Sequence, residues 1–419
     1  MTRSPAVADW ETEFQRWLAP FLGCLGHKAR QRWLPVYVRG QMSATCRRCA
    51  TTMARELAPE DEEQLHHFVS TSPWDGAPLE AELVRAANAL VGGPDSFLII
   101  DDTALVKKGK ESAGVARQYC GELGKRANCQ SLVSLTLARG EVPVPIALRL
   151  FLPESWDSDE RRRRKCGVPE AVHHRPKWKI ALEEVDRAMA WGAQFAEALA
   201  DAAYGSCGEF RRGLSERKLR WTVGILPQQQ VYPDDVTLSV AAPGGKGRPP
   251  KHRAPSARSV SARETIESLG PRAWRTIGWR EGTKGPLRAR FAIVRVRAAD
   301  GAGTSRGRRN PGESVWLICE ERENGERRYY LSNHPLSAPR QRLAASVKSR
   351  WSCEQAHQQM KQELGLNHYE GRSWSGLHHH CLLTLIAYAF LQHLRLAGKK
   401  NFAGASRRLA PRCRRSAAG

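Results

Sequence analysis

The spacing of hydrophobic residues divides the chain into a helical beginning and an α/β remainder. Up to residue 90, stretches such as 59–69 and 78–90 repeat apolar residues at intervals near 3.6, which predicts amphipathic helices. The pattern changes at residues 96–103, where a short apolar run ends in Asp101 and Asp102 and predicts a buried strand. A new domain is therefore expected to begin near residue 91.

Further strands and helices are predicted beyond this first strand. Two strand patterns, 130–138 and 144–152, flank a turn at 139–141 and are expected to pair. The pattern then predicts the remaining elements of this region: a helix over 177–191, a strand over 195–201, a helix over 208–218 and a strand over 219–226. The order β-β-β-α-β-α-β describes an α/β core whose first part occupies residues 91–230.

Residues 231–335 are predicted to form a β-rich insertion. Glycine, proline and basic residues gather in two loops, 241–258 and 300–312, and alternating apolar and polar residues mark strands between and after them. A helical pattern over 338–364 and an apolar helix over 381–396 indicate that the core resumes in residues 336–396. Residues 397–419 are rich in Lys and Arg, contain no acid, and read as a basic tail.

The charge balance points to a polyanionic partner. The 419 residues include 66 Lys and Arg against 43 Asp and Glu, a formal net charge of +23. Charge alone does not separate DNA from RNA or an anionic membrane, but the aromatic-rich strand motifs of common RNA-binding modules are absent. The sequence contains no apolar run of about 18 residues and no signal-like beginning, so a protein of the cytoplasm without a membrane partner is expected.

Three aspartates stand at the ends of predicted strands. Asp101 and Asp102 end one apolar run, and Asp201 ends another. An ionised carboxylate in a low-dielectric interior is costly unless a cation compensates it. If the two strands are neighbours, one acid from each can converge on a metal-sized space. The alternative is that such acids cap the following turn or helix.

The long helix at 338–364 carries a further acid between two cations. Arg350, Glu354 and Lys361 are spaced i, i+4 and i+11, which places them within about 40° of one another on one helix face. A carboxylate that ligates metal between two phosphate-binding cations explains this stripe. Ordinary ion pairing on an exposed face explains it as well.

The order of these residues resembles that of the DDE transposases of bacterial insertion sequences, which have an RNase H-like fold. Arg350, Glu354 and Lys361 match the last three positions of that family's Tyr-x2-Arg-x3-Glu-x6-Lys signature, whereas Val347 stands where tyrosine is expected. The resemblance runs from about residue 10 to residue 395. Four other segments are similar to stretches of the family: 101–103, 114–119, 152–156 and 199–205.

The resemblance implies an RNase H-like mixed-sheet core and two-metal catalysis. In this reading Asp102, Asp201 and Glu354 hold two Mg²⁺ ions, for which Mn²⁺ can substitute. Successive strand residues face opposite sides, and Asp102 is chosen over Asp101 because it directly precedes Thr103, as in the family. The residues assigned to DNA phosphates are Arg350, Lys361, Lys107, Lys108 and Arg117.

The expected partner is double-stranded DNA, as transposon terminal inverted repeats and as target, bound by a homodimer in the bacterial nucleoid. The helical domain of residues 1–90 is expected to recognise the DNA ends through clustered arginines. The run 161–165 is expected either to contact phosphates or to form a solvated surface. Trp279 is expected either to act as a wedge beside a flipped base or to pack in the insertion. The histidines at 378–380 are expected to form a solvated or DNA-facing cluster. The arginines of the cluster are Arg30, Arg32, Arg39, Arg47 and Arg48.

Two other functions fit the same residues. One is a stand-alone RNase H-fold nuclease that cuts DNA without joining it. The other is a non-enzymatic DNA-binding protein derived from an inactive transposase. The three intact acids argue against a loss of catalytic activity, whereas Val347 and the basic tail argue mildly for such a loss.

Overall fold

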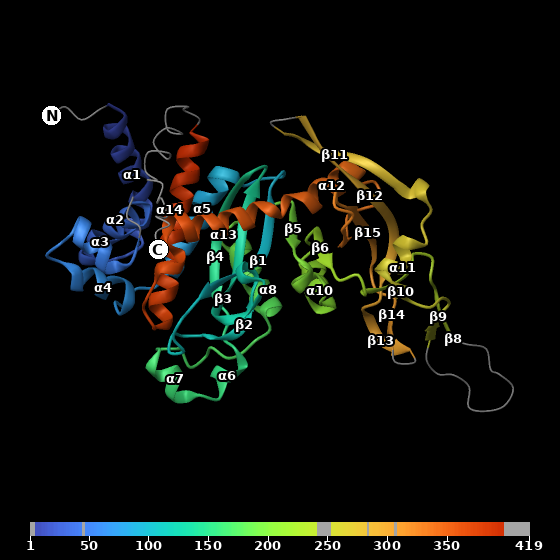
Figure 1. Ribbon diagram of the computed structural model, residues 1–419, viewed down its shortest axis with the longest axis horizontal. Helices are drawn as coiled ribbons and strands as arrows, with labels where there is room; N and C mark the ends of the chain where they lie inside the picture. The colour runs from blue at the N-terminus through green and yellow to red at the C-terminus, as the bar shows by residue number, and fades with distance from the viewer. Residues whose placement is uncertain (1–4, 44–46, 241–252, 283–284, 306–307, 398–419) are drawn as a thin grey trace, which may run out of the picture. The chain divides into compact units, whose positions relative to one another are not determined.

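The computed structural model describes residues 5–43, 47–240, 253–282, 285–305 and 308–397 (Figure 1). These residues form two compact units: the first contains the chain up to Phe195 and again from Ser352, and the second spans Ala196–Trp351. Most of the predicted basic loop at 241–258 and nearly all of the basic tail lie outside the described residues. No helix among the described residues has both the length and the apolar character needed to pass through a membrane.

The first unit begins with five helices, which confirms the helical N-terminal region predicted from the sequence. Their buried faces follow the 3.6-residue spacing, as in α4, where Leu65, Phe68 and Val69 are buried. The helices are α1 (Pro5–Gly23), α2 (Lys28–Met42), α3 (Ala50–Leu57), α4 (Glu62–Ser70) and α5 (Ala77–Val91).

Four antiparallel strands form the sheet of the first unit. They are β1 (Phe97–Val106), β2 (Ala116–Cys120), β3 (Lys125–Arg139) and β4 (Val142–Leu150). The longest strand, β3, pairs with each of the other three. Its residues from Cys129 to Ala138 are all buried, so helices must cover both of its faces. The sequence pattern did not predict β2, whose first four residues alternate between half-buried and exposed and whose last residue, Cys120, is buried.

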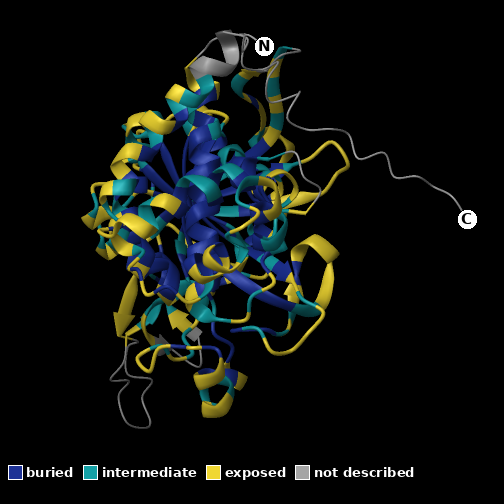
Figure 2. Ribbon diagram, turned by 90° about the vertical axis from the view of Figure 1, so that its left-hand side faces the viewer, coloured by how far each residue is buried: buried dark blue, intermediate teal, exposed yellow. Residues whose placement is uncertain are grey.

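The remaining helices of the first unit come from distant parts of the sequence. They are α6 (Glu154–Asp157), α7 (Glu160–Lys165), α8 (Lys177–Ala190), most of α13 (Trp351–Leu364), and α14 (Trp374–Leu396). The last of these begins seven residues earlier than the apolar pattern predicted and packs on β4, α2 and α5. Because it is apolar nearly all round, it is buried along most of its length (Figure 2).

The histidine run on α14 lies in the interior, so the expectation of a solvated or DNA-facing cluster is wrong. His379 stacks on Trp74 with ring centroids 3.6 Å apart, and His380 is fully buried. Nε2–H of His380 donates to the carbonyl of Leu366 at 3.1 Å, and the hydroxyl of Tyr37 donates to Nδ1 at 2.9 Å. These two bonds fix one neutral tautomer, which is why the ring can be buried.

The second unit is built on a mixed sheet. Its strands follow the order β10-β7-β12-β15-β16-β6-β5, with β11 pairing on β12, and only β5 and β6 are parallel. This agrees with the predicted α/β class and confirms a β-rich insertion. The strands of this sheet are β5 (Glu197–Ala200), β6 (Trp221–Ile225), β7 (Gln230–Pro233), β10 (Val260–Ser261), β11 (Trp274–Gly282), β12 (Gly285–Ala298), β15 (Ser314–Glu321) and β16 (Arg327–Ser332).

Short elements complete the second unit. Two separate pairs of strands are antiparallel, β8 with β9 and β13 with β14. The short strands and the helices are β8 (Leu238–Val240), β9 (Arg253–Pro255), β13 (Gly301–Ser305), β14 (Arg308–Asn310), α9 (Ala202–Gly205), α10 (Gly208–Glu216), α11 (Ala262–Glu267) and α12 (Arg340–Ser349).

Helix α12 packs on the β11–β12 hairpin through an apolar cluster. Leu343, Ala344 and Val347 of α12 meet Ile277 and Phe291 of the hairpin. Val347 therefore serves the core at the position where the family signature has tyrosine. The single helix predicted over 338–364 is interrupted at Arg350, which keeps helical dihedrals and leads directly into α13.

A buried glutamate ties β5 to α12 within the second unit. Glu197 is fully buried, and its carboxylate accepts hydrogen bonds from the hydroxyls of Thr222 and Ser346. His334 Nε2 lies 3.0 Å from the same carboxylate, and the Arg342 guanidinium lies 3.4 Å from it. A buried carboxylate is tolerated only with such partners.

The buried state of His380 predicts acid sensitivity of the fold. Burial lowers the pKa of His380 to about 4, whereas the unfolded chain titrates near 6.5. Between these values the unfolded chain binds a proton that the folded chain excludes, so the free energy of unfolding falls as pH drops below 6.5. At pH 5 we expect a loss on the order of 2 kcal/mol from this residue relative to pH 7.5.

Urea unfolding at both pH values measures this loss. His380→Gln should remove that part of the pH dependence, and His67→Gln, on the exposed side of α4, should not. An unchanged pH dependence in His380→Gln would remove His380 as its source.

Candidate active site

The first acidic pair lies in the middle of β1, and its two carboxylates face opposite sides of the strand. Asp101 is 8% exposed and pairs in register with Ser134 of β3. Its Oδ2 accepts a hydrogen bond from the Cys353 thiol at 3.2 Å. Asp102 is half-buried, and its carboxylate receives the Lys177 ammonium at 2.5 Å. Asp102 is thus the more accessible acid and is already matched with a positive charge.

Two contacts attach α13 to the strands that carry these acids. Besides the bond from Cys353 to Asp101, the His357 ring lies 2.8 Å from the Ser134 hydroxyl. Cys353 and His357 are one helical turn apart and both are buried. Glu354, the residue after Cys353, is exposed. The first unit therefore holds Asp102 and Glu354 on two elements that are anchored to each other.

Asp201 belongs to the second unit, where it ends β5 and caps α9. Its Oδ1 accepts hydrogen bonds from the backbone N–H of Ala203 at 3.0 Å and of Tyr204 at 3.3 Å. The short helix lies close to β6, because a Cβ on Gly205 would collide with the Gly224 carbonyl oxygen. The capping role weighed for this aspartate is confirmed. Within the described residues of either unit, no three acid, histidine or cysteine side chains are arranged to hold a metal.

The two cations of the predicted signature occupy different surroundings. Arg350 is half-buried at the junction of α12 and α13. The Lys361 side chain is 12% exposed, and its ammonium lies 2.8 Å from the Glu122 carboxylate. A phosphate that binds Lys361 would have to compete with that ion pair.

The basic loop after β1 contains one internal lysine and exposed neighbours. The Lys107 ammonium donates to the Tyr369 carbonyl at 2.6 Å, and burial lowers the pKa of Lys107. Lys108 and Arg117 are exposed and line the same cavity, of about 600 Å³. Of the three residues assigned to phosphates in this region, Lys108 and Arg117 are placed to meet a ligand.

The run 161–165 coincides with α7, and its side chains diverge. Arg163 is buried, where it meets the Asp157 carboxylate and the carbonyls of Pro169 and Glu170. Arg164 is exposed. Only part of this run is therefore available to a phosphate.

The clustered arginines of the N-terminal helices are largely engaged within the unit. Arg32 pairs with Asp61, Arg39 with Glu11 and Arg47 with Glu370, and Arg48 donates to the Ser43 carbonyl. These partners reduce the positive charge that the cluster can offer to DNA. Arg30 has no ion pair with any acid that the structure describes.

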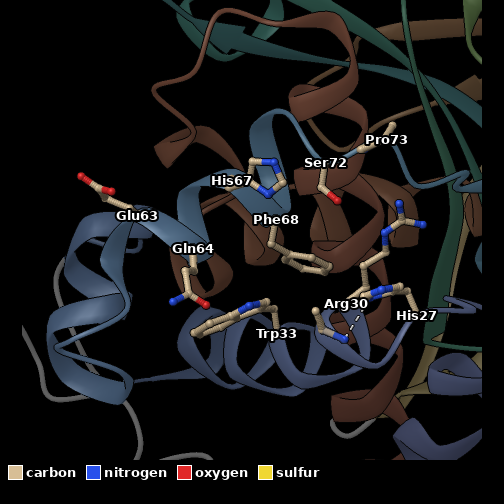
Figure 3. Close-up of a pocket in the computed structure, with 10 residues that line it drawn as sticks. His27, Arg30, Trp33, Glu63, Gln64, His67, Phe68, Ser72 and Pro73 are labelled. Atoms are coloured by element: carbon tan, nitrogen blue, oxygen red, sulfur yellow. Dashed lines mark hydrogen bonds between the residues drawn. The ribbon is translucent and has the colours of Figure 1, made fainter.

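Arg30 lines a hollow of about 510 Å³ between α2 and α4 (Figure 3). Trp33 from α2 and Phe68 from α4 form its aromatic side, and His67 and Gln64 add polar groups. Both aromatic rings are almost fully buried. A ligand could enter this hollow, but its two aromatic rings are buried by packing within the helical region.

Trp279 has a packing role. Its ring meets Phe291 edge-on at 6.4 Å, and the Lys348 ammonium lies over it at 4.9 Å. The alternative of a wedge for a flipped base gains no support from this position.

Sequence reasoning missed Lys177, Cys353 and His357. Lys177 begins α8 after Pro176, and nothing in its local sequence indicates that it reaches an acid 75 residues earlier. Cys353 and His357 flank Glu354 on the inner face of α13, where helical spacing alone indicates burial but not the identity of the partner.

The sequence matches a known protein family and is similar to a curated protein. Residues 20–286, more than half of the chain, match the family described as DDE superfamily endonuclease, and this range includes Asp102 and Asp201. Over 201 residues the chain is 29% identical to the probable transposase for insertion sequence element IS701 of Microchaete diplosiphon. The alignment covers 46% of this chain and 50% of that protein, so the chain spans about half the length of the curated relative it matches.

The capping geometry of Asp201 predicts how its variants differ in stability. Asparagine caps a helix as well as aspartate does, whereas alanine leaves the two N–H groups without a side-chain acceptor. Asp201→Ala should lower the free energy of unfolding by about 1 kcal/mol and Asp201→Asn by a few tenths at most. Urea titration of both variants measures the difference, and equal losses would contradict the capping role.

Proposed function

Because the chain belongs to the DDE superfamily endonucleases, we propose that it is a transposase that binds the terminal inverted repeats of an insertion sequence and catalyses metal-dependent DNA cleavage and strand transfer. One observation carries the proposal beyond family membership. An accessible aspartate on β1, Asp102, and an exposed glutamate on α13, Glu354, sit on elements joined by the Asp101–Cys353 and Ser134–His357 contacts.

In this proposal Asp102, Asp201 and Glu354 would hold two Mg²⁺ ions. Carboxylate oxygens are the ligands that this ion prefers, and Asp102 already accepts the positive charge of Lys177. Bound divalent ions supply a nucleophile at neutral pH and stabilise the leaving oxygen. The proposal requires Asp201 of the second unit to join the two acids of the first.

The choice of Asp102 over Asp101 is supported by what each carboxylate touches. Asp101 is buried, and its oxygens accept the Cys353 thiol and the N–H of Asp102. It therefore anchors α13. Asp102 keeps partial exposure on the other side of the strand.

Lys177 acts on Asp102 directly. Its ammonium stabilises the ionised carboxylate and fixes its orientation before a ligand binds. The same ammonium lies 5.4 Å from the centre of the Phe151 ring. This cation–π contact can hold the Lys177 ammonium when Asp102 binds a metal ion instead.

The DNA backbone is proposed to contact Arg350, Lys361, Lys108 and Arg117. Arginine suits bidentate phosphate binding, and lysine acts as a point charge. Lys107 contributes through the shape of its loop, since its ammonium binds the Tyr369 carbonyl. The DNA is double-stranded, as terminal inverted repeats and as target, and two chains are proposed to pair two ends.

A cleavage and joining assay tests the catalytic assignment. Purified protein with Mg²⁺ should nick and join DNA that carries the inverted repeats flanking its gene. Asp102→Asn, Asp201→Asn and Glu354→Gln should each lower the rate by at least about 10³-fold, because each removes a metal ligand, with DNA binding retained. Glu363→Gln, on the same helix as Glu354, is the matched control and should keep the wild-type rate.

The products separate this proposal from its alternatives. Nicking without joining indicates a stand-alone nuclease, and binding without nicking indicates a DNA-binding protein derived from an inactive transposase. Undiminished cleavage in one of the three variants would remove that residue from the site.

The net charge of +23 predicts binding that depends steeply on salt. Each neutralised phosphate releases counterions, so the logarithm of the association constant should fall linearly with the logarithm of salt concentration, with a slope of about −5 or steeper. Fluorescence anisotropy between 50 and 300 mM salt, roughly the range over which such slopes are resolved, gives this slope. A flat response would contradict phosphate binding by the basic surface.

A further inference from the structure

The cavity beside the β1–β2 loop has an excess of unpaired positive charge. Lys108, Lys110, Arg117 and Arg162 line it, and all lie in the first unit. Lys108, Lys110 and Arg117 form no ion pair with any acid that the structure describes. We call this cavity the loop pocket.

The one acid of the loop pocket is already neutralised. Glu111 pairs with Lys165 at 2.7 Å, and the hydrogen bond from Lys165 lowers the pKa of Glu111. Among the described residues, Lys108, Lys110 and Arg117 therefore have no acid as a counterion. An anionic ligand is the partner that such a pocket fits.

The walls of the loop pocket are fixed before any ligand binds. The Asn128 side chain donates to the carbonyls of Lys107 and Gly109, each at 2.8 Å, and so holds the loop in one conformation. Preformed walls lower the entropy lost on binding.

Arg162 is fixed in the same way. Its guanidinium lies 4.0 Å from the ring of the buried Trp156 and donates to the Lys110 carbonyl at 2.9 Å, with Asp159 at 3.8 Å as its nearest acid. Trp156 is in turn held by the Val115 carbonyl at 2.9 Å. An arginine clamped on an aromatic ring presents its remaining N–H groups at a constant position.

The lining favours a phosphate over a nucleobase. The described residues that line the loop pocket include no aromatic side chain on which a base could stack. The lysines, the arginines and Ser155 supply donors that suit phosphate oxygens.

The position of the loop pocket in the sequence sets the greatest distance that can separate it from Asp102. Lys108 follows Asp102 by six residues, and β1 continues to Val106. An extended chain rises about 3.3 Å per residue, which places the pocket up to about 20 Å from Asp102. In B-form DNA this length corresponds to about six base pairs.

We propose that the loop pocket binds one backbone phosphate of the DNA, at most about six base pairs from the phosphodiester that is cut. This inference rests on the proposed function for its choice of DNA and for the reference point of the distance. By binding this phosphate, the loop pocket would fix the position of the DNA backbone along β1.

The test measures binding in EDTA, so it does not depend on cleavage. Inverted-repeat DNA is made with a single neutral methylphosphonate at each position in turn. The wild-type protein should lose about tenfold in affinity at one position within about six nucleotides of the cut, because one charged contact is removed. Lys110→Ala and Arg117→Ala should each reduce the salt slope by about 1 and abolish that position-specific loss.

Arg139→Ala is the control, since Arg139 is exposed at the opposite end of β3 from Asn128 and donates to the carbonyls of Gly92 and Leu90. It should keep both the salt slope and the position-specific loss. A wild-type protein that binds the DNA but never cuts it would refute the proposed catalysis. The methylphosphonate scan, with positions counted from the end of the repeat, would still show whether the loop pocket binds a backbone phosphate.

Two results would overturn the assignment of the loop pocket. One is a scan in which Lys110→Ala and Arg117→Ala lose affinity at the same positions as wild type. The other is competition by inorganic phosphate at constant ionic strength, without any position-specific loss, which would assign the pocket to free phosphate. A wild-type protein that fails to bind DNA would reject both proposals.

Discussion

The alternation of side chains along β1 is the constraint on which the candidate site depends. Because successive residues of a strand face opposite sides, the Asp101-Asp102 pair gives one carboxylate to each face. The inner carboxylate receives the Cys353 thiol and fixes α13, and the outer one receives Lys177. A single pair of acids thus supplies both the anchor for the helix that carries Glu354 and an accessible ligand for a cation.

Many of the positively charged side chains form ion pairs or hydrogen bonds with acids and carbonyls of the same chain. The arginines expected to read DNA in the N-terminal helices mostly meet acids or carbonyls, and Arg163 is buried with Asp157. What distinguishes the loop pocket is that three of its cations, Lys108, Lys110 and Arg117, form no ion pair with an acid of the described residues, while its walls are fixed. Charge density in the sequence therefore locates basic segments, but only the tertiary structure separates structural cations from those that a ligand can reach.

The local parts of this molecule were predictable from the sequence, and the long-range parts were not. Apolar runs located β1 and β5, although β1 continues four residues beyond the Asp101-Asp102 pair that was expected to end it. Helical spacing located α8, α10 and much of α13 and α14. Edge strand β2 was not predicted because its first four residues alternate between half-buried and exposed. The three histidines of α14 were misjudged because their polar atoms find partners in α2, in α4, in the 3-10 helix Leu366–His368 and in α14 itself. Contacts between residues 75 or 252 positions apart, such as Lys177 with Asp102 and Cys353 with Asp101, leave no periodic signal.

The buried carboxylate of Glu197 connects these observations within the second unit. Glu197 and Asp201 are four residues apart on an extended chain, so their side chains leave the same face of β5. The partners of Glu197 include Ser346 and Arg342 of α12, which therefore crosses that face. Since α12 runs through Arg350 directly into α13, the strand that ends in Asp201 and the helix that leads to Glu354 are held by one ion cluster. Removing one partner of such a cluster leaves a buried charge uncompensated, at a cost of about 3–5 kcal/mol. A cluster that costly to disturb keeps α12 fixed against β5, so the order within the second unit depends on the one carboxylate that both elements share.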